Sequence, residues 1–205
     1  MTVKIMLLTQ KELEDLPCWA VVAFAARCAR RSLPLYQGCG NIPLENTQAV
    51  ENAVSMAEDI AAKGTCEESQ AAELAAREAE YAARAAEASL KDKSNSEDDA
   101  KAAAHAARAA EYAARAAGRA HGKDLTQNAA RVTSRFAAKD AERAAIYSHF
   151  SLEALDAKSS SCAAMRQDYN NLRQAVEKEH WTMQKSVLPD FFGSLWPDGT
   201  PKGLP

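Results

Sequence analysis

Apolar residues, most of them alanine, recur at the three- and four-residue spacing of amphipathic helices along most of this chain. In Ala75–Glu87, alanines share one side of a helical projection, and Arg77, Glu80 and Arg84 share the other. The stretch Ala106–Gly118 repeats this one at 11 of 13 positions, 31 residues later. A third, less similar copy begins another 31 residues later, at Ala137, and keeps the alanines and much of the charge pattern. An alanine face lets two helix axes approach to the short end of the usual range of about 8–10 Å. The repeat therefore predicts stacked, closely packed helices.

Residues that start or stop helices divide this pattern into seven segments. Thr9 precedes Glu12 by three residues, and Thr65 precedes Glu68 by three, a spacing that satisfies free N–H groups in a first turn. Glycine-containing and polar stretches separate the segments. The predicted helices cover about residues 10–16, 17–32, 43–63, 66–90, 97–121, 125–157 and 161–187.

The C-terminal segment Pro189–Pro205 differs from the rest of the chain. It holds four of the seven prolines together with Phe191, Phe192 and Trp196, and proline does not continue a helix. We expect an extended arm that packs on the domain rather than another helix. The predicted fold is an all-α, single-domain bundle of about six to seven helices, with the helical domain at 1–188 and the arm at 189–205.

Composition supports this fold and narrows the function. Of the 205 residues, 45 are alanine, and the formal charge of −3 argues against a general nucleic-acid binder, which usually has a basic domain. The longest apolar run, Cys18–Ala26, is much shorter than the about 20 residues of a membrane span. Five widely spaced cysteines without a Cys-x-x-Cys pair indicate reduced thiols. We expect a cytoplasmic protein that contacts neither nucleic acid nor membrane.

The charged stripes of the repeat allow two interpretations. They could form a cationic groove for an acidic partner or nucleic acid, or a solvated helix face with ion pairs three and four residues apart. Each pair of arginines brings its own acid, such as Glu80 before Arg84 and Glu111 before Arg115. This pairing favours the solvated, internally neutralised face.

Two other groups of residues are candidates for binding a protein partner. Arg27, Arg30 and Arg31 follow the apolar run; they could neutralise the C-terminal dipole of their helix, which we favour, or form a basic contact patch. The arm aromatics could anchor a partner or, as we favour, cover a groove of this chain. The candidate partner-binding residues are Arg27, Arg30, Arg31, Phe191, Phe192 and Trp196.

Catalytic and metal-binding patterns are weak. Glu177 and His180 have the Glu-x-x-His spacing of di-iron bundles, but such a site needs a second copy, which the sequence lacks. Cys28 has two neighbouring arginines but no local base to activate it as a nucleophile. The turn at Gly38–Gly40 matches neither the P-loop nor the Gly-x-Gly-x-x-Gly motif, the two glycine-rich loops that bind phosphate groups. We expect no catalytic residue, no cofactor and no metal.

Two consecutive segments carry a family resemblance. Trp19–Tyr36, followed by Ala49–Glu58 and alanine-rich helices, resembles the immunity-protein-five-like helical proteins of bacteria. Members often show Ala-x-x-Cys-Ala-x-Arg-x-Leu-Pro-Leu-aromatic, then an Ala-Ile-Glu helix, then Ala-His-Ala-Ala. The matching positions are Ala25, Cys28, Ala29, Arg31, Leu33, Pro34, Leu35 and Tyr36, then Ala49, Val50 and Glu51, then Ala104, His105 and Ala106. The 31-residue duplication and the Trp-Pro-Asp-Gly arm depart from the family pattern.

The resemblance implies a protein that binds and blocks a co-encoded toxin without performing chemistry itself. We therefore expect a non-catalytic protein–protein interaction module. The more specific expectation is a bacterial immunity or inhibitor protein that docks on one protein partner. The first alternative is a structural scaffold that assembles into homo-oligomers through its alanine faces. The second is a metal-binding helical bundle.

Overall fold

The computed structural model describes residues 7–40, 42–64, 67–89, 97–120, 127–155, 157–182 and 185–204. These residues form seven α-helices and two short 3₁₀ turns, and no strand occurs among them. The fold is an all-α bundle, as the sequence predicts. The elements are α1 (Gln10–Glu14), α2 (Cys18–Gln37), α3 (Leu44–Lys63), α4 (Ser69–Ser89), α5 (Glu97–Arg119), α6 (Gln127–Ser151), η1 (Leu152–Leu155), α7 (Lys158–Glu179) and η2 (Pro189–Phe192).

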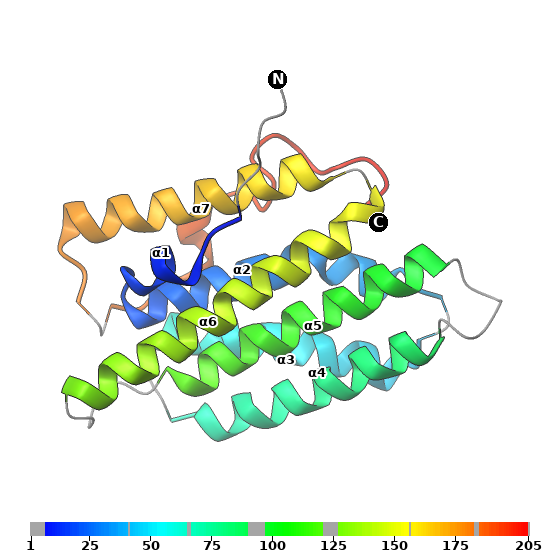
Figure 1. Ribbon diagram of the computed structural model, residues 1–205, viewed down its shortest axis with the longest axis horizontal. Coiled ribbons are helices and arrows are strands. Elements are labelled where there is room, and N and C mark those ends of the chain that lie inside the picture. Colours follow the sequence, from blue (N-terminus) through cyan, green and yellow to red (C-terminus); the bar gives the residue numbers. More distant parts are fainter. Residues whose placement is uncertain are drawn as a thin grey trace.

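Helix α5 is the centre of the bundle. It packs against α2, α3, α4 and α6, and Figure 1 shows α4, α5 and α6 side by side in front of α2 and α3. Helix α7 follows the upper edge in this view and packs on α2 and α6. None of the described helices is long and apolar enough to cross a membrane.

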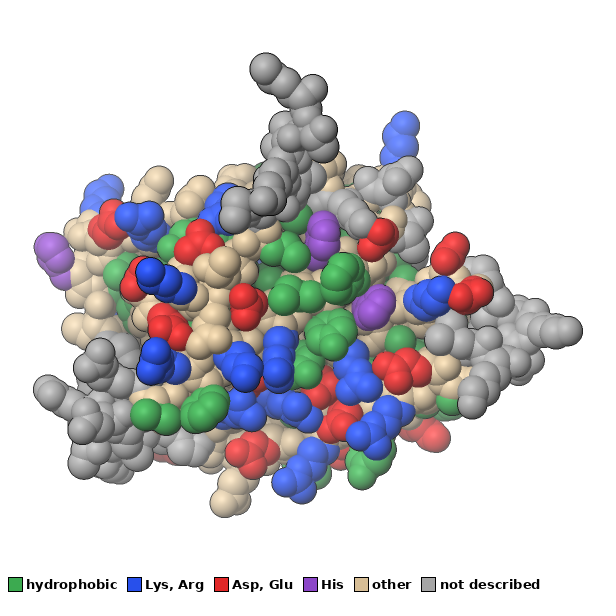
Figure 2. Space-filling model, viewed as in Figure 1, with side chains coloured by type: hydrophobic (Ala, Val, Ile, Leu, Met, Phe, Trp, Pro, Cys, Tyr) green, Lys and Arg blue, Asp and Glu red, His purple; other side chains and the backbone are tan. Residues whose placement is uncertain are grey.

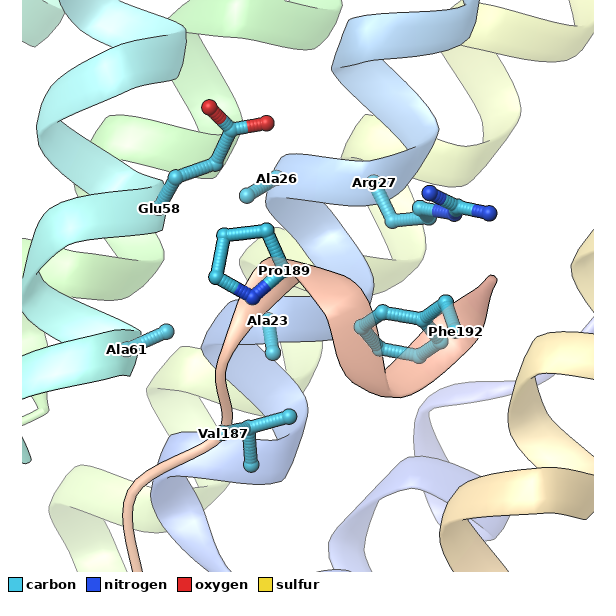
Figure 3. Close-up of a pocket in the computed structure, with 8 residues that line it drawn as sticks. All are labelled: Ala23, Ala26, Arg27, Glu58, Ala61, Val187, Pro189 and Phe192. Carbon is cyan, nitrogen blue, oxygen red and sulfur yellow. The ribbon is translucent and has the colours of Figure 1, made fainter. Parts of the chain in front are cut away.

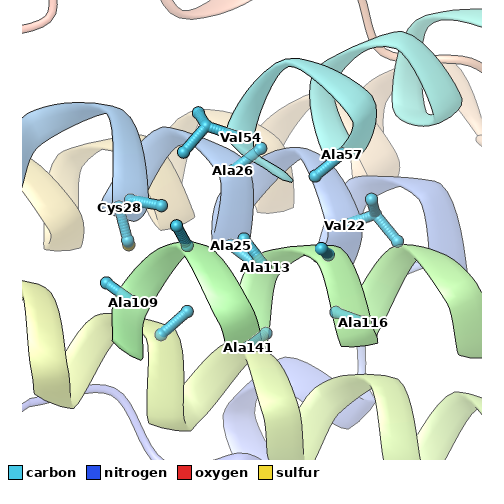
Figure 4. Packing of buried hydrophobic residues seen from close by; sticks show 14 of the residues in the cluster. Val22, Ala25, Ala26, Cys28, Val54, Ala57, Ala109, Ala113, Ala116 and Ala141 are labelled. Carbon is cyan, nitrogen blue, oxygen red and sulfur yellow. The ribbon is translucent and has the colours of Figure 1, made fainter. Parts of the chain in front are cut away.

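Alanine makes this dense arrangement possible. In the first repeat copy, Ala79 and Ala82 are fully buried, and Ala110 and Ala113 are fully buried in the second. Figure 4 shows alanines of α2, α5 and α6 meeting at the same level of the core. Near the end of α5, a Cβ added to Gly118 would lie 3.0 Å from the Glu73 side chain and 3.3 Å from the Ser69 carbonyl oxygen. Helices α4 and α5 therefore approach so closely there that even an alanine would require its neighbours to shift by a few tenths of an ångström.

Replacing Ala82 by leucine is expected to lower the free energy of unfolding by about 1–3 kcal/mol through overpacking. Ala82 is fully buried, and its carbonyl oxygen accepts a hydrogen bond from the Tyr36 hydroxyl at 3.2 Å. Urea unfolding followed by circular dichroism measures the change. Ala85 lies on the exposed side of the same helix, so Ala85→Leu is the control, and equal stability of both variants would contradict this packing.

The ends of α2, α6 and α7 differ most from the sequence predictions. Helix α6, predicted to reach about residue 157, ends at Ser151 and is followed by the 3₁₀ turn η1. Helix α2 continues through Pro34 to Gln37, five residues beyond its predicted end, because Leu33 and Tyr36 are buried and Gly38 N–H donates to the Pro34 carbonyl. Helix α7 ends eight residues early, at Glu179, because His180 adopts a left-handed conformation with φ 52°.

Of the two predicted N-terminal caps, at Thr9 and Thr65, only the first falls on described residues. Thr9 and Glu12 form the predicted capping box at the start of α1. The predicted cap at Thr65 lies outside the described residues, as does Cys66. Four cysteines are described, Cys18, Cys28, Cys39 and Cys162, and all four are buried.

Candidate functional site

The structure brings four of the six predicted partner-binding residues together where the C-terminal arm crosses α2. Arg31 is fully buried there; its Nη2 atom donates to Asp168 Oδ2 of α7 at 2.6 Å, and its Nε atom donates to the Leu195 carbonyl at 3.0 Å. The Arg31 guanidinium also lies 5.6 Å from the centre of the Trp196 ring. We call the group Arg27, Arg31, Asp168, Phe192 and Trp196 the arm clasp.

Arg27 provides the second half of the arm clasp. Its Nη2 atom donates to the Gly193 carbonyl at 2.9 Å and to the Ser194 carbonyl, and its Nε atom lies 3.5 Å from Asp168 Oδ2. Its guanidinium lies 5.2 Å from the centre of the Phe192 ring. Burial raises the pKa of the Asp168 carboxyl although both arginines act to lower it, and burial lowers the pKa of Arg27. The clasp thus balances the fully buried guanidinium of Arg31 and the largely buried one of Arg27 with one carboxylate and three arm carbonyls.

A small cavity lies beside the arm clasp, between α2, α3 and the arm. Figure 3 shows Ala23 and Ala26 of α2, Ala61 of α3, Val187 just before the arm, and Phe192 of the arm around it. Its volume is about 30 Å³, which is room for one or two waters rather than for an organic ligand. The Val187 N–H donates to the Ala61 carbonyl at 2.9 Å and fixes the arm on α3 at this edge.

The remaining two candidate residues lie outside the arm clasp. Phe191 packs against Trp181 and Phe192, with ring centres 5.3 and 5.2 Å apart. Arg30 points to α3 instead, where its Nε atom donates to Glu58 at 2.9 Å. All six side chains therefore have contacts within the chain, and their binding to a partner stays a prediction.

Asp168 is the clasp residue that sequence reasoning missed. It lies in α7 between Met165 and Leu172, both fully buried. An acid three or four residues from buried apolar positions on a helix shares their face. That spacing is the signal that could have identified it as a buried, paired carboxylate.

The residues considered for chemistry are divided between the core, which holds Cys28, and the exposed C-terminal end of α7, which holds Glu177 and His180. Cys28 is fully buried, and burial raises the pKa of its thiol to about 12, which disfavours the thiolate form that a cysteine nucleophile needs. Glu177 and His180 are exposed on α7. The described residues contain no group of three or more His, Cys, Asp or Glu side chains that could hold a metal ion. Cys162 and His149, which the sequence did not single out, are in contact at 3.3 Å.

A second candidate site covers the front of the bundle. Between Lys101 and Arg119, α5 reaches solvent only through one stripe of residues spaced three or four apart. Figure 2 shows Lys and Arg side chains gathered over this region with hydrophobic side chains between them. We call it the arginine–tyrosine face, and it consists of the α5 stripe Lys101, His105, Arg108, Tyr112, Arg115 and Arg119 with Arg143, Tyr147 and Phe150 of α6.

Buried carboxylates lie beneath the arginines of this face. The Glu111 side chain is 1% exposed and pairs with Arg108 at 3.0 Å and Arg115 at 2.8 Å. Asp140, equally buried, accepts a hydrogen bond from Arg119 at 2.6 Å. The prediction of a solvated stripe is therefore wrong for Glu111, because α5 is enclosed by its neighbours and only the outer ends of its longest side chains reach water.

Aromatic rings continue the face from α5 to α6. Tyr112 and Tyr147 are stacked, with ring centres 5.5 Å apart and planes within 5°. The guanidiniums of Arg115 and Arg143 lie 5.4 and 5.1 Å from the centre of the Tyr112 ring. His105 extends the row, with its ring centre 5.8 Å from that of Tyr147. The rings and guanidiniums therefore hold one another in place.

The stability contribution of Glu111 is expected to increase as the pH falls. Burial raises the pKa of Glu111 in the folded protein, so the folded state binds its proton more tightly than the unfolded state does. Between the unfolded and the raised folded pKa, lowering the pH therefore favours folding. Wild type should gain melting temperature relative to Glu111→Gln between pH 7 and pH 4.5, and a relative loss would contradict a raised pKa.

Comparisons of this chain with protein-family models, curated proteins and solved structures found no match. The resemblance to the immunity-protein-five-like family accordingly stays a prediction from the residues quoted above. The fold and the two sites define an all-α bundle with a clasped arm and an ordered cationic and aromatic face. A functional proposal rests on the geometry of these sites.

Proposed function

We propose that this chain is a non-catalytic protein-binding module. More specifically, we propose a cytoplasmic immunity or inhibitor protein of bacteria that docks on one protein partner, such as a toxin. The observation that carries the proposal is the arginine–tyrosine face, where Tyr112, Tyr147 and Arg143 stack against one another at the surface. Tyrosine and arginine are the residue types enriched in the energetic centres of protein interfaces.

The order within the face strengthens this proposal. Binding costs side-chain entropy when flexible side chains become fixed at an interface. On this face a partner would fix few side chains that are still free to move, because ion pairs already hold Arg115 to Glu80 at 2.9 Å and to Glu111 at 2.8 Å. The loss of side-chain entropy on binding is therefore small. Tyrosine adds large contact area with little conformational freedom to lose. The face is thus preorganised for contact with another protein.

Affinity capture from the native host with the full chain as bait tests the proposal. We expect one protein to be enriched, and we expect the purified pair to bind at a defined stoichiometry in isothermal titration calorimetry. Arg173→Ala bait is the control, because Arg173 is exposed on α7 and pairs only with Glu177 in the described chain. Enrichment of no protein under conditions where the bait stays folded would refute the protein-binding function.

A self-associating scaffold is the second candidate, and the outer side of α4 favours it. Leu74 is 57% exposed and Tyr81 is 69% exposed, two turns apart on the same side of the helix. Exposed Ala85 and Ala88 extend the side. Light scattering over a range of concentrations tests the scaffold: an oligomer that Leu74→Glu dissociates would support it, and a monomer at every concentration would exclude it.

A further inference from the structure

We infer that the arginine–tyrosine face binds an acidic, amphipathic helix of the partner protein, laid along α5. This inference rests on the proposed function and adds the chemistry of the partner and its position on the fold. Between Lys101 and Arg119 the α5 stripe spans about 27 Å at 1.5 Å per residue. A partner helix of about 18 residues would match that length, with acids over the guanidiniums and apolar residues over the rings.

The layering of charge supports an acidic occupant. Glu111 and Asp140 lie beneath the face with 1% of each side chain exposed, whereas the side chains of Arg115 and Arg119 are 29% and 41% exposed. A partner therefore meets guanidinium groups first, although the acids below neutralise much of their charge at long range. Guanidinium groups that are already fixed can offer their remaining N–H donors to a partner carboxylate with two parallel hydrogen bonds.

Arg143 is the strongest single anchor. It is half-buried, and its guanidinium rests on the Tyr112 ring at 5.1 Å. Among the described residues no carboxylate lies within ion-pair distance of Arg143, unlike Arg108, Arg115 and Arg119. Among the described arginines of this face, Arg143 is thus the one whose guanidinium a partner carboxylate would pair with at ion-pair distance, although Asp140 acts on it at longer range.

The edges of the face favour a protein over a nucleic acid. Exposed acids lie at both ends of the α5 stripe, with Glu97 one turn before Lys101 and Glu73 of α4 beside Gly118. A polynucleotide that continued past the arginines would carry its phosphates over these carboxylates. A short helix with a few acids can end before it reaches them. The formal charge of −3 on the whole chain points the same way.

Fluorescence anisotropy with three synthetic probes tests the inference on the full chain. The probes are an amphipathic glutamate-rich peptide of about 18 residues, the same peptide with lysine in place of glutamate, and an oligothymidylate of the same net charge as the first. We expect the acidic peptide alone to bind, and to bind several-fold more weakly as ionic strength rises from about 50 to 300 mM.

Arg143→Gln should weaken acidic-peptide binding about tenfold, as expected for an arginine at an interface centre. The affinity of Arg143→Lys for the acidic peptide should lie between those of wild type and Arg143→Gln, because lysine keeps the charge and lacks the planar guanidinium. Arg173→Gln on α7 is the matched control and should bind as wild type does. Melting curves establish that each variant is folded.

Three results would overturn the inference. They are equal weakening in Arg143→Gln and Arg173→Gln, equal binding of the acidic and lysine peptides, and oligothymidylate binding with the same sensitivity to Arg143→Gln, which would mark a nucleic-acid surface. Failure of the proposed function looks different. A captured partner that keeps its affinity for Arg143→Gln would leave the protein-binding function in place and refute this surface. Acidic-peptide binding at Arg143 without any captured partner would support this surface and refute the protein-binding function.

Discussion

Replacing Asp168 by alanine should lower the free energy of unfolding by about 3–5 kcal/mol, the cost of leaving a buried charge without its partner. Arg31 has no exposed side-chain surface, and its Nη2 atom donates to Asp168 at 2.6 Å. Without the carboxylate, Arg31 and Arg27 would face each other with no compensating negative charge. The arm carbonyls that they also contact cannot supply that charge.

Urea unfolding at neutral pH measures this loss, and α7 provides its own control. Glu177 is an exposed carboxylate on the same helix and pairs with Arg173 at 2.8 Å. Exposed pairs contribute about 0–1 kcal/mol, so Glu177→Ala should cost that much at most. If both variants lost the same stability, the contact between Arg31 and Asp168 would not be holding α7 and α2 together.

Replacing both charged partners separates the loss of a pair from the loss of one charge. The double variant Arg31→Met with Asp168→Leu removes the fully buried pair and retains similar volume, while Arg27, whose side chain is 12% exposed, keeps its contacts with the arm carbonyls. Buried ion pairs replaced in this way often lose little stability. We expect the double variant to be more stable than Asp168→Ala. The reverse order would mean that the contact of Arg31 with the Leu195 carbonyl, at 3.0 Å, contributes more than its pairing with Asp168.

The helices could be predicted because their determinants are local. Alanine spacing, the Thr9 cap and the glycine breaks all act within a few residues, and the seven predicted segments correspond to α1 through α7. The errors lie where tertiary contacts act against local preference. Helix α2 passes Pro34 because Tyr36 beyond it is buried and donates to the Ala82 carbonyl. A single sequence does not contain that contact with α4.

The candidate sites could be predicted only in part, for the same reason. The arginines of the arm clasp and its aromatics were identified, but Asp168 pairs with a residue 137 positions away. The α5 stripe from Lys101 to Arg119 is readable as a helical repeat, whereas the burial of Glu111 depends on how closely α4 and α6 enclose α5. The spacing of residues along the chain predicts which of them share a face of a helix. It does not state how much of that face its neighbours cover.

Trp196 is expected to be the main anchor of the C-terminal arm, and Trp196→Ala should cost about 3–5 kcal/mol, as for other buried tryptophans. The side chain is 6% exposed and packs with Leu152, Ala157 and Ala164. Its loss would open a cavity beneath the arm and would weaken the position of the Leu195 carbonyl that accepts from Arg31.

Urea unfolding and amide hydrogen exchange together locate this effect. Leu188 immediately precedes the arm and is 60% exposed, so Leu188→Ala should change stability by no more than about 0.5 kcal/mol. In Trp196→Ala, amides of 193–204 should exchange faster while those of α5 keep the highest protection in the protein. If Trp196→Ala instead matched Leu188→Ala in stability and exchange, burial would not be holding the arm. Its aromatic residues would then be available to a partner, and the preference for an arm that covers its own bundle would be wrong.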